Sequence, residues 1–315
     1  MYRIEYKGYT VIFPNEAVAS LFDRASTAVA LGNFDGVHIA HKALIDRAIQ
    51  MKNDCGCDMA GAWSFSENPL KYFIKNPPMA IHSPEKKAEI LLSLGLDFVV
   101  LADFGVFKDV PHESFCQYLK EDIGVKSVVC GYNFRFGKGG GGTPAYLTEF
   151  FGEDSAFVIG EVDFDGQPVS STRIRSLIEN GEIKTANILL GRYFALTSEV
   201  VGGKRLGRSI GFPTANQSFE SGALIPKNGI YATRCNIDGV GYIGVTNVGV
   251  RPTVEDTKTV NAETYILDFS GDIYGKKIDV EFIEYLREET KFSSIDELKV
   301  AISSDAEAAR RIVKL

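Results

Sequence analysis

The feature that most constrains the fold of this chain is an apolar run that ends in a glycine-flanked loop and leads into a helical pattern. Residues 28–31 read Ala-Val-Ala-Leu, residues 32–37 read Gly-Asn-Phe-Asp-Gly-Val, and residues 42–49 are amphipathic. This order predicts a buried strand, a tight loop and a helix. His38 and His41 then stand three residues apart at the start of the helix, on one face.

The start of this predicted helix favours a bound anion. Its free backbone N–H groups and the positive end of the helix dipole attract negative charge, and Gly32 and Gly36 let the backbone approach closely. The imidazoles of His38 and His41 can donate hydrogen bonds to phosphate oxygens and stabilise charge that develops there. A metal half-site or two surface histidines are the alternatives for an isolated pair. The strand–loop–helix context favours transfer of AMP from ATP instead.

Length, charge and cysteine usage limit the class of protein. At 315 residues two domains are expected, and we place them at residues 1–185 and 186–315. The excess of 41 acidic over 34 basic residues argues against a protein that mainly grips nucleic acid. No apolar run approaches the roughly 18 residues of a membrane span, and the N-terminus lacks the apolar core of a signal peptide. Five scattered cysteines indicate reduced thiols and a cytoplasmic location.

The two halves differ in pattern. Residues 26–165 alternate strand and helix patterns, which predicts a mostly parallel sheet covered by helices. The predicted strands there are 28–31, 59–65, 96–101, 127–130 and 156–161, with helices over 83–92 and 111–119. Residues 176–192 predict two short bridging helices. Beyond them, runs rich in Val, Ile, Tyr and Thr predict an antiparallel barrel or sandwich, with strands at 195–201, 229–237, 241–248, 262–269 and 278–285 and a closing helix over 294–313.

Two further clusters in the first half suit a nucleotide. Asn133 lies in a loop after a predicted strand, where its amide can hydrogen-bond a base, ribose or phosphate. Ser171, Thr172 and Arg175 stand at a predicted helix start, where hydroxyls, free N–H groups and a guanidinium can clamp phosphate; simple helix capping is the alternative. Gly137–Gly142 only superficially resembles a phosphate-binding loop, and a mobile, solvated loop is its alternative.

The second half offers another phosphate site and a general base. A basic, glycine-rich loop that can wrap phosphates contains Gly203, Lys204, Arg205 and Gly207. It leads to Pro213, and to Thr214 and Asn216, whose hydroxyl and amide oxygens suit Mg²⁺ carrying ATP; a plain turn is the alternative. Glu263 lies in a strand-like run and can take a proton from an alcohol that attacks ATP, although most strand glutamates simply face water.

In this order the motifs are similar to those of a known family. The first half has Gly-x-Phe-Asp-Gly-x-His-x-x-His from Gly32, Gly-x-Asn-Phe-x-Phe-Gly from Gly131 and Ser-Ser-Thr-x-Ile-Arg from Ser170. The second half has Gly-Phe-Pro-Thr-Ala-Asn from Gly211, Asn-Gly-Ile-Tyr-Ala from Asn228, Asn-Val-Gly-Val-Arg-Pro-Thr from Asn247, then Glu263, Tyr274-Gly275 and Leu286-Arg287-x-Glu289-x-x-Phe292. From about Ala28 to the C-terminus the chain resembles the bacterial bifunctional riboflavin kinase/FMN adenylyltransferases, or FAD synthetases.

The resemblance implies an α/β nucleotidyltransferase (Rossmann-like) domain, followed by a small six-stranded antiparallel β-barrel riboflavin kinase domain with a C-terminal helix. It implies that ATP and Mg²⁺ serve two steps, from riboflavin to FMN and from FMN to FAD. In the first domain it implies ATP contacts for Gly32, Phe34, Asp35, Gly36, His38, His41, Asn133, Ser171, Thr172 and Arg175. In the second it implies ATP and Mg²⁺ contacts for Gly203, Lys204, Arg205, Gly207, Pro213, Thr214 and Asn216, and flavin contacts for Asn228, Tyr231, Arg251 and Arg287. Glu263 would be the base that activates the riboflavin 5′-hydroxyl.

Four positions depart from the family's pattern. Ala40 stands where glycine is usual between the histidines, Asn68 where histidine is usual, Gly140 where arginine is expected, and Tyr265 where histidine is common. One alternative is therefore a riboflavin kinase whose first domain is weak or inactive. Another is a non-catalytic flavin- or nucleotide-binding regulator, against which the retained Glu263 argues, because a pure binder needs no base.

Overall fold

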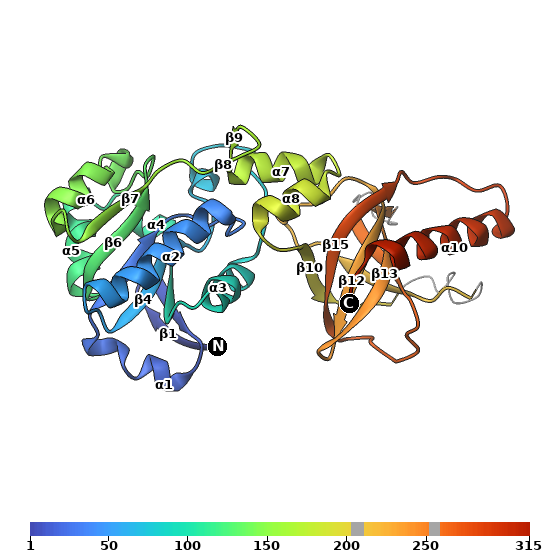
Figure 1. Ribbon diagram of the computed structural model, residues 1–315, viewed down its shortest axis with the longest axis horizontal. Coiled ribbons are helices and arrows are strands. Elements are labelled where there is room, and N and C mark those ends of the chain that lie inside the picture. Colours follow the sequence, from blue (N-terminus) through green and yellow to red (C-terminus); the bar gives the residue numbers. More distant parts are fainter. Residues whose placement is uncertain (203–210, 252–258) are drawn as a thin grey trace. The chain divides into compact units, whose positions relative to one another are not determined.

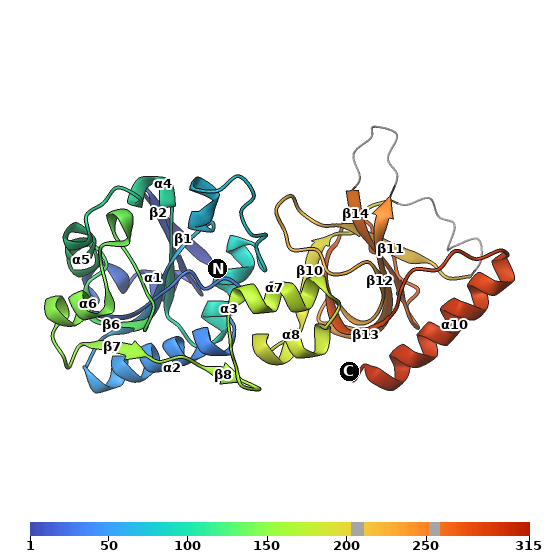
Figure 2. The same cartoon turned by 90° about the horizontal axis from the view of Figure 1, so that it is seen from above.

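A computed structural model describes residues 1–202, 211–251 and 259–315 of the chain (Figures 1 and 2). The chain divides into two compact units, residues 1–171 and 172–315. Helices α7 (Ser171–Glu179) and α8 (Ile183–Leu190) confirm the two short helices expected near the junction. The predicted domain boundary after residue 185 stays a prediction.

The first unit is built on a seven-stranded sheet in the order β1-β2-β5-β4-β3-β6-β7. The strands are β1 (Tyr2–Tyr6), β2 (Tyr9–Phe13), β3 (Thr27–Leu31), β4 (Met59–Phe65), β5 (Phe98–Ala102), β6 (Val125–Gly131) and β7 (Ala156–Ile159). Strands β3 to β7 run parallel, which confirms the predicted α/β class. Strands β1 and β2 form an antiparallel hairpin that extends the sheet beside β5, and this hairpin is absent from the sequence-based prediction.

Helices cover both faces of this sheet (Figure 2). Helices α2 (Ile39–Asp54) and α3 (Pro84–Ser93) pack on one face. Helices α1 (Glu16–Ala19), α5 (His112–Glu121) and α6 (Pro144–Phe151) pack on the other. Strand β3 shows why its run is wholly apolar: alternate side chains enter opposite cores, Ala28 and Ala30 toward α2, Val29 and Leu31 toward α5. The shorter elements are α4 (Phe104–Phe107), η1 (Phe22–Arg24), η2 (Pro69–Tyr72), η3 (Lys138–Gly140), β8 (Asp163–Phe164) and β9 (Gln167–Pro168).

The second unit is an antiparallel sheet in the order β10-β15-β12-β13-β14-β11. Its strands are β10 (Phe194–Glu199), β11 (Thr214–Ser218), β12 (Gly229–Ile237), β13 (Val240–Arg251), β14 (Thr259–Ile266) and β15 (Lys277–Arg287). Just beyond β10, the backbone N–H of Val201 donates to the carbonyl of Asn216 in β11 at 2.8 Å. This isolated bridge joins the two edges, so the sheet closes into the predicted barrel and the alternative of a sandwich is wrong.

Helix α10 (Ile295–Ile312) lies along the outside of the barrel (Figure 1). Ser294 caps it by accepting a hydrogen bond from the Glu297 N–H at 3.2 Å. Ala309 and Val313 pack on the outward side chains of β12 and β13. This confirms the predicted C-terminal helix and explains why β12 is buried on both of its faces.

Candidate functional site

The loop after β3 has a constrained backbone at the place where sequence predicts phosphate binding. Phe34 and Val37 have positive φ angles of 47° and 43°, in a region that bulky and β-branched residues rarely adopt. Both side chains are fully buried, at 0 % and 1 % exposure, so packing holds the backbone in this conformation. Gly36 also has a positive φ, of 82°. Such strain accumulates at functional sites and persists only where the surroundings enforce it.

His38 and His41 lie together at the N-terminus of α2, as predicted. His38 is the residue that caps the helix: its Nδ1 accepts a hydrogen bond from the backbone N–H of His41 at 3.3 Å. The two rings stack with centroids 3.6 Å apart and an interplanar angle of 12°. Because Nδ1 of His38 accepts, a neutral His38 ring carries its proton on Nε2 and can donate there. The Phe34 ring meets His41 edge-on at 5.2 Å and helps to fix it.

Asp35 and Ser171 hold this loop to its surroundings. Oδ1 of the buried Asp35 accepts from the backbone N–H of Ile81 at 3.0 Å. The Ser171 hydroxyl, at the first residue of α7, donates to the Asp35 carbonyl at 2.8 Å. The structure therefore brings Ser171 to the histidine-bearing loop. Further along α7, Thr172 is exposed and Arg175 is buried.

The second predicted loop, after β6, is largely exposed but is anchored at Phe136 and Gly142, which are buried. Asn133 is exposed at its start. Phe136 and Gly142 pair as an isolated antiparallel bridge, and a Cβ on Gly142 would lie 2.5 Å from the Phe136 ring. Gly137 has a φ of 70°, and a Cβ there would lie 2.7 Å from the backbone of His112. Only glycine fits these two positions, which anchor the loop, and whether the loop binds a ligand stays a prediction.

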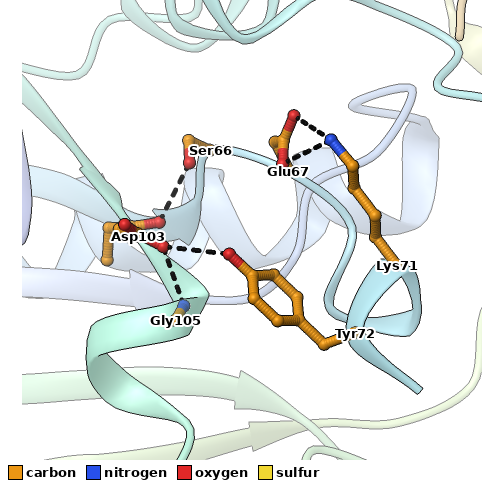
Figure 3. A network of polar contacts seen from close by, with 7 residues as sticks. Ser66, Glu67, Lys71, Tyr72, Asp103 and Gly105 are labelled. Atoms are coloured by element: carbon orange, nitrogen blue, oxygen red, sulfur yellow. Dashed lines mark hydrogen bonds and ion pairs between the residues drawn. The ribbon is translucent and has the colours of Figure 1, made fainter.

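Asn68, which stands where the motif resemblance leads one to expect histidine, caps a short helix. Oδ1 of Asn68 accepts from the Leu70 N–H at 3.0 Å and caps η2. Figure 3 shows the surrounding polar contacts, in which Glu67 pairs with Lys71 at 2.7 Å. The Tyr72 hydroxyl donates to Asp103 at 3.2 Å. Asn68 thus shapes the segment after β4, and no charged group replaces the histidine at that position.

In the second unit, three polar side chains stand in a row across neighbouring strands. Glu263 of β14 lies opposite Asn216 of β11 on one side and opposite Asn247 of β13 on the other. Residues directly opposite in an antiparallel pair share a face. Thr264, the next residue, is fully buried and shares a hydrogen bond of 2.9 Å with Thr246 inside the barrel. The row therefore lies on the outer face, and Thr214 is on the same face, two residues from Asn216.

The amide groups of this row have free acceptor capacity. Asn216 is 6 % exposed, and its Nδ2 donates to the Thr214 carbonyl at 3.4 Å. Oδ1 of Asn247 is buried and has no hydrogen-bond partner within the described parts of the chain. An orphaned buried acceptor is costly, and it suits a donor that a ligand brings. Sequence reasoning noted the motif that begins at Asn247 but gave this residue no role.

The other predicted residues of the second unit are more scattered. Tyr231 is fully buried, its hydroxyl donates to the Lys227 carbonyl, and burial raises its pKa. Arg287 makes a bidentate ion pair with Asp305 of α10, at 2.7 and 3.0 Å. Asn228 is exposed, as is Pro213 just before β11. Gly203, Lys204, Arg205 and Gly207 lie outside the described residues, as does the side chain of Arg251.

Two family models match the chain, each over one half. A model described as FAD synthetase matches residues 22–173, and one described as riboflavin kinase matches residues 190–313. The chain is 32 % identical to a bifunctional riboflavin kinase/FMN adenylyltransferase of Listeria monocytogenes over 90 % of this chain and 91 % of that protein. It is 34 % identical to the protein of that name from Haemophilus influenzae, over 90 % and 93 %.

The fold as a whole has a solved counterpart. A crystal structure from Streptococcus pneumoniae, described as a macrolide-efflux protein, matches with a TM-score of 0.82 and 30 % identity. The match covers 90 % of this chain and 94 % of that one. Among the described residues, no helix has the length and apolar character to cross a membrane.

Proposed function

The chain belongs to the family of bifunctional riboflavin kinase/FMN adenylyltransferases, and from this premise we propose which of its residues carry the two reactions. It phosphorylates riboflavin to FMN with ATP, and it transfers AMP from a second ATP to FMN to give FAD. The presence of both catalytic domains favours this function over a kinase alone and over a non-catalytic regulator.

For adenylyl transfer, we assign the phosphate-binding site to the loop after β3 and the N-terminus of α2. An oxygen of the FMN phosphate attacks the α-phosphorus of ATP, and pyrophosphate leaves. Negative charge develops on the α-phosphate oxygens and on the leaving group during this step. The imidazoles of His38 and His41 and the free N–H groups of the helix start can stabilise that charge. Asn133, Thr172 and Arg175 are proposed as further ATP contacts.

For the kinase step, we assign the general base to Glu263. The riboflavin 5′-hydroxyl gives its proton to the carboxylate and attacks the γ-phosphorus of ATP, and ADP leaves. The single observation that supports this role is the outer-face row, in which an amide flanks Glu263 on either side. The buried, unpartnered oxygen of Asn247 can accept a hydrogen bond from the same substrate region.

We propose that Mg²⁺ accompanies ATP at Thr214 and Asn216. The fit rests on donor chemistry: Mg²⁺ uses few protein oxygens and keeps water and phosphate as its other ligands. Because Nδ2 of Asn216 is turned to the Thr214 carbonyl, its Oδ1 remains for a ligand. Within the described residues no cluster of three His, Cys, Asp or Glu side chains offers another metal site. The ion would neutralise phosphate charge while these residues orient it.

Separation of the products from riboflavin, ATP and Mg²⁺ by chromatography tests the whole assignment. We expect FMN to appear first and FAD to follow. FMN without FAD would support the kinase-only alternative. Binding of riboflavin without any product would support the regulator.

A further inference from the structure

Lys87 of α3 has no part in the reactions described above, yet it is the only buried lysine among the residues that the structure describes. It is 5 % exposed, and it lies in the first turn of its helix, where the helix dipole disfavours a cation. Burial lowers its pKa to about 8, and the charge of Asp35 partly opposes this shift. A cation kept at so unfavourable a position calls for a functional explanation.

The contacts of Lys87 show what it holds. Its Nζ donates to the Asn33 carbonyl at 3.2 Å, to the Ser64 hydroxyl at 3.0 Å and to the Phe65 carbonyl. The Ser64 hydroxyl also donates to the Asn33 carbonyl, at 2.9 Å. Two donors therefore fix one carbonyl of the loop after β3 against the end of β4. All three N–H groups of the ammonium donate to protein acceptors, so Lys87 supports the loop and has no donor left for a ligand.

The fixed carbonyl determines where the other edge of its peptide points. In a planar trans peptide the C=O and N–H groups point in opposite directions. The N–H that belongs to the Asn33 peptide is that of Phe34, which therefore points away from Lys87. Phe34 is 0 % exposed and its ring contacts His41, so the orientation of this peptide sets the place of the ring beside the histidine pair. The carbonyl that Lys87 holds is therefore next to the strained Phe34, whose ring helps to fix His41.

We propose that Lys87 is a positioning residue for adenylyl transfer, which holds the Asn33 carbonyl and so keeps the strained loop in the conformation that places His38 and His41. This inference rests on the proposed function of the loop. The histidine donors face charge that develops during the reaction, so their placement contributes mainly to kcat, because they act most strongly in the transition state. Loss of the ammonium frees the Asn33–Phe34 peptide to rotate, and the histidine beside the Phe34 ring is then misplaced.

The test compares Lys87→Met with a control, Lys52→Met. Lys52 lies on α2, is partly buried and pairs with Asp97 at 2.7 Å. We expect Lys87→Met to lower kcat for FAD formation by about 10²-fold with little change in KM for ATP. Riboflavin phosphorylation by the same protein should be unchanged, and Lys52→Met should resemble the wild type. The fluorescence of Trp63, the chain's one tryptophan, reports whether the first unit is folded. Wild-type kcat in a folded Lys87→Met variant would overturn the proposal.

The pH dependence of FAD formation provides a second test, because a lysine with only a structural role would not change it. Asp35 is the titratable group whose charge acts on Lys87, while β4 presents only the neutral Ser64 hydroxyl and Phe65 carbonyl. FAD formation by the wild type should fall as pH rises through about 8, and Lys87→Arg should keep its activity to higher pH. Identical profiles for the two proteins would contradict the proposal even if Lys87→Met failed to fold.

The same assay separates this proposal from the proposed function. If the wild type makes no more FAD than a His38→Ala/His41→Ala variant, the function assigned to the loop is wrong, and the role of Lys87 is wrong with it. If the wild type is active and Lys87→Met matches it, only the role of Lys87 is wrong.

Discussion

Asn247 faces Glu263 across the β13–β14 pair, and its buried amide oxygen has no partner among the described residues. A carboxylate and an amide oxygen are both acceptors, so the Glu263 carboxylate cannot satisfy the Asn247 oxygen. Each can instead receive a hydrogen bond from a hydroxyl that a substrate brings. The relationship places an unsatisfied acceptor beside the proposed base, on the outer face of the barrel.

Replacement of the base should separate the two activities. Glu263→Gln keeps the size of the side chain but removes its ability to accept a proton, so FMN formation should fall by about 10²–10⁴-fold. Conversion of supplied FMN to FAD should be unchanged. Glu284→Gln, on β15, removes an ion pair with Lys184 and serves as the matched control. Normal FMN production by Glu263→Gln would show that another group takes the proton.

The Mg²⁺ assignment predicts a specific change in the nucleotide requirement. Thr214→Ala and Asn216→Ala each remove a proposed oxygen ligand or its orienting partner, so the apparent KM for Mg-ATP should rise by about tenfold. Ser218→Ala, on the same strand and face, removes only a hydroxyl that donates to Asn261 at 3.0 Å and should change little. Unchanged Mg²⁺ and ATP requirements in both site variants would exclude these residues.

The stacked histidines predict a loss confined to FAD synthesis. His38→Ala/His41→Ala removes two side-chain donors from the phosphate site, and FAD formation should fall by at least about 10²-fold. Riboflavin phosphorylation should persist. The assay follows FAD and pyrophosphate from FMN and ATP, with Trp63 fluorescence as the folding control. Equal rates in the variant and the wild type would mean that this loop is not the active site.

The Arg287–Asp305 ion pair predicts a mainly structural role for an arginine that the motif resemblance assigned to the flavin. Asp305→Asn weakens a bidentate, charge-assisted contact, so the free energy of unfolding of the second unit should fall by about 1–2 kcal/mol; partial exposure of Arg287 keeps the effect at the lower end. The loss of kinase activity on heating measures this change in stability. A raised KM for riboflavin at unchanged stability would restore the flavin assignment.

The buried Lys87 predicts that, as pH rises, the stability of the protein increases while its FAD-forming activity falls. Its folded-state pKa of about 8 lies below the usual 10.5, so the unfolded chain binds more protons between these values. The free energy of unfolding should therefore rise with pH across this window, by up to about 3 kcal/mol. Trp63 fluorescence in denaturant titrations of the wild type and Lys87→Met isolates this contribution. A difference between the two proteins that is constant with pH would contradict the shift.

Strands with strong alternation or full burial were predictable from local sequence. The predicted runs 59–65 and 229–237 match β4 and β12 to the residue. Strand β11 was missed because Pro213 and Asn216 are turn signals, and its strand conformation depends on pairing with the distant β14. The β1–β2 hairpin precedes the alternating region, and its outer strand is largely exposed, so hydrophobic periodicity marks it weakly.

The site was predictable where residue type implies chemistry, and it was missed where burial gives a residue its role. His38, His41 and Glu263 have side chains whose chemistry suggests a function in any context. Lys87 occupies a helix whose pattern indicates an ordinary surface lysine, and only the fold shows that it is buried beneath the loop. Asn247 likewise gains its significance from Glu263, sixteen residues later in sequence but adjacent in the sheet.

Among the described residues, the barrel is closed by the backbone bridge between Val201 and Asn216 and by the hydrogen bond that the Gln217 side chain donates to the Ser198 carbonyl at 2.8 Å, so this seam is the easiest part to open. On its other side β11 pairs with β14 over five residues, so separation at the seam breaks little and leaves the rest of the sheet intact. We therefore expect the Val201 amide to exchange with solvent deuterium sooner than the amides of β12. Because Asn216 lies at this seam and is proposed to bind Mg-ATP, the nucleotide would hold the barrel shut, and protection of one backbone amide would report occupancy of the kinase site.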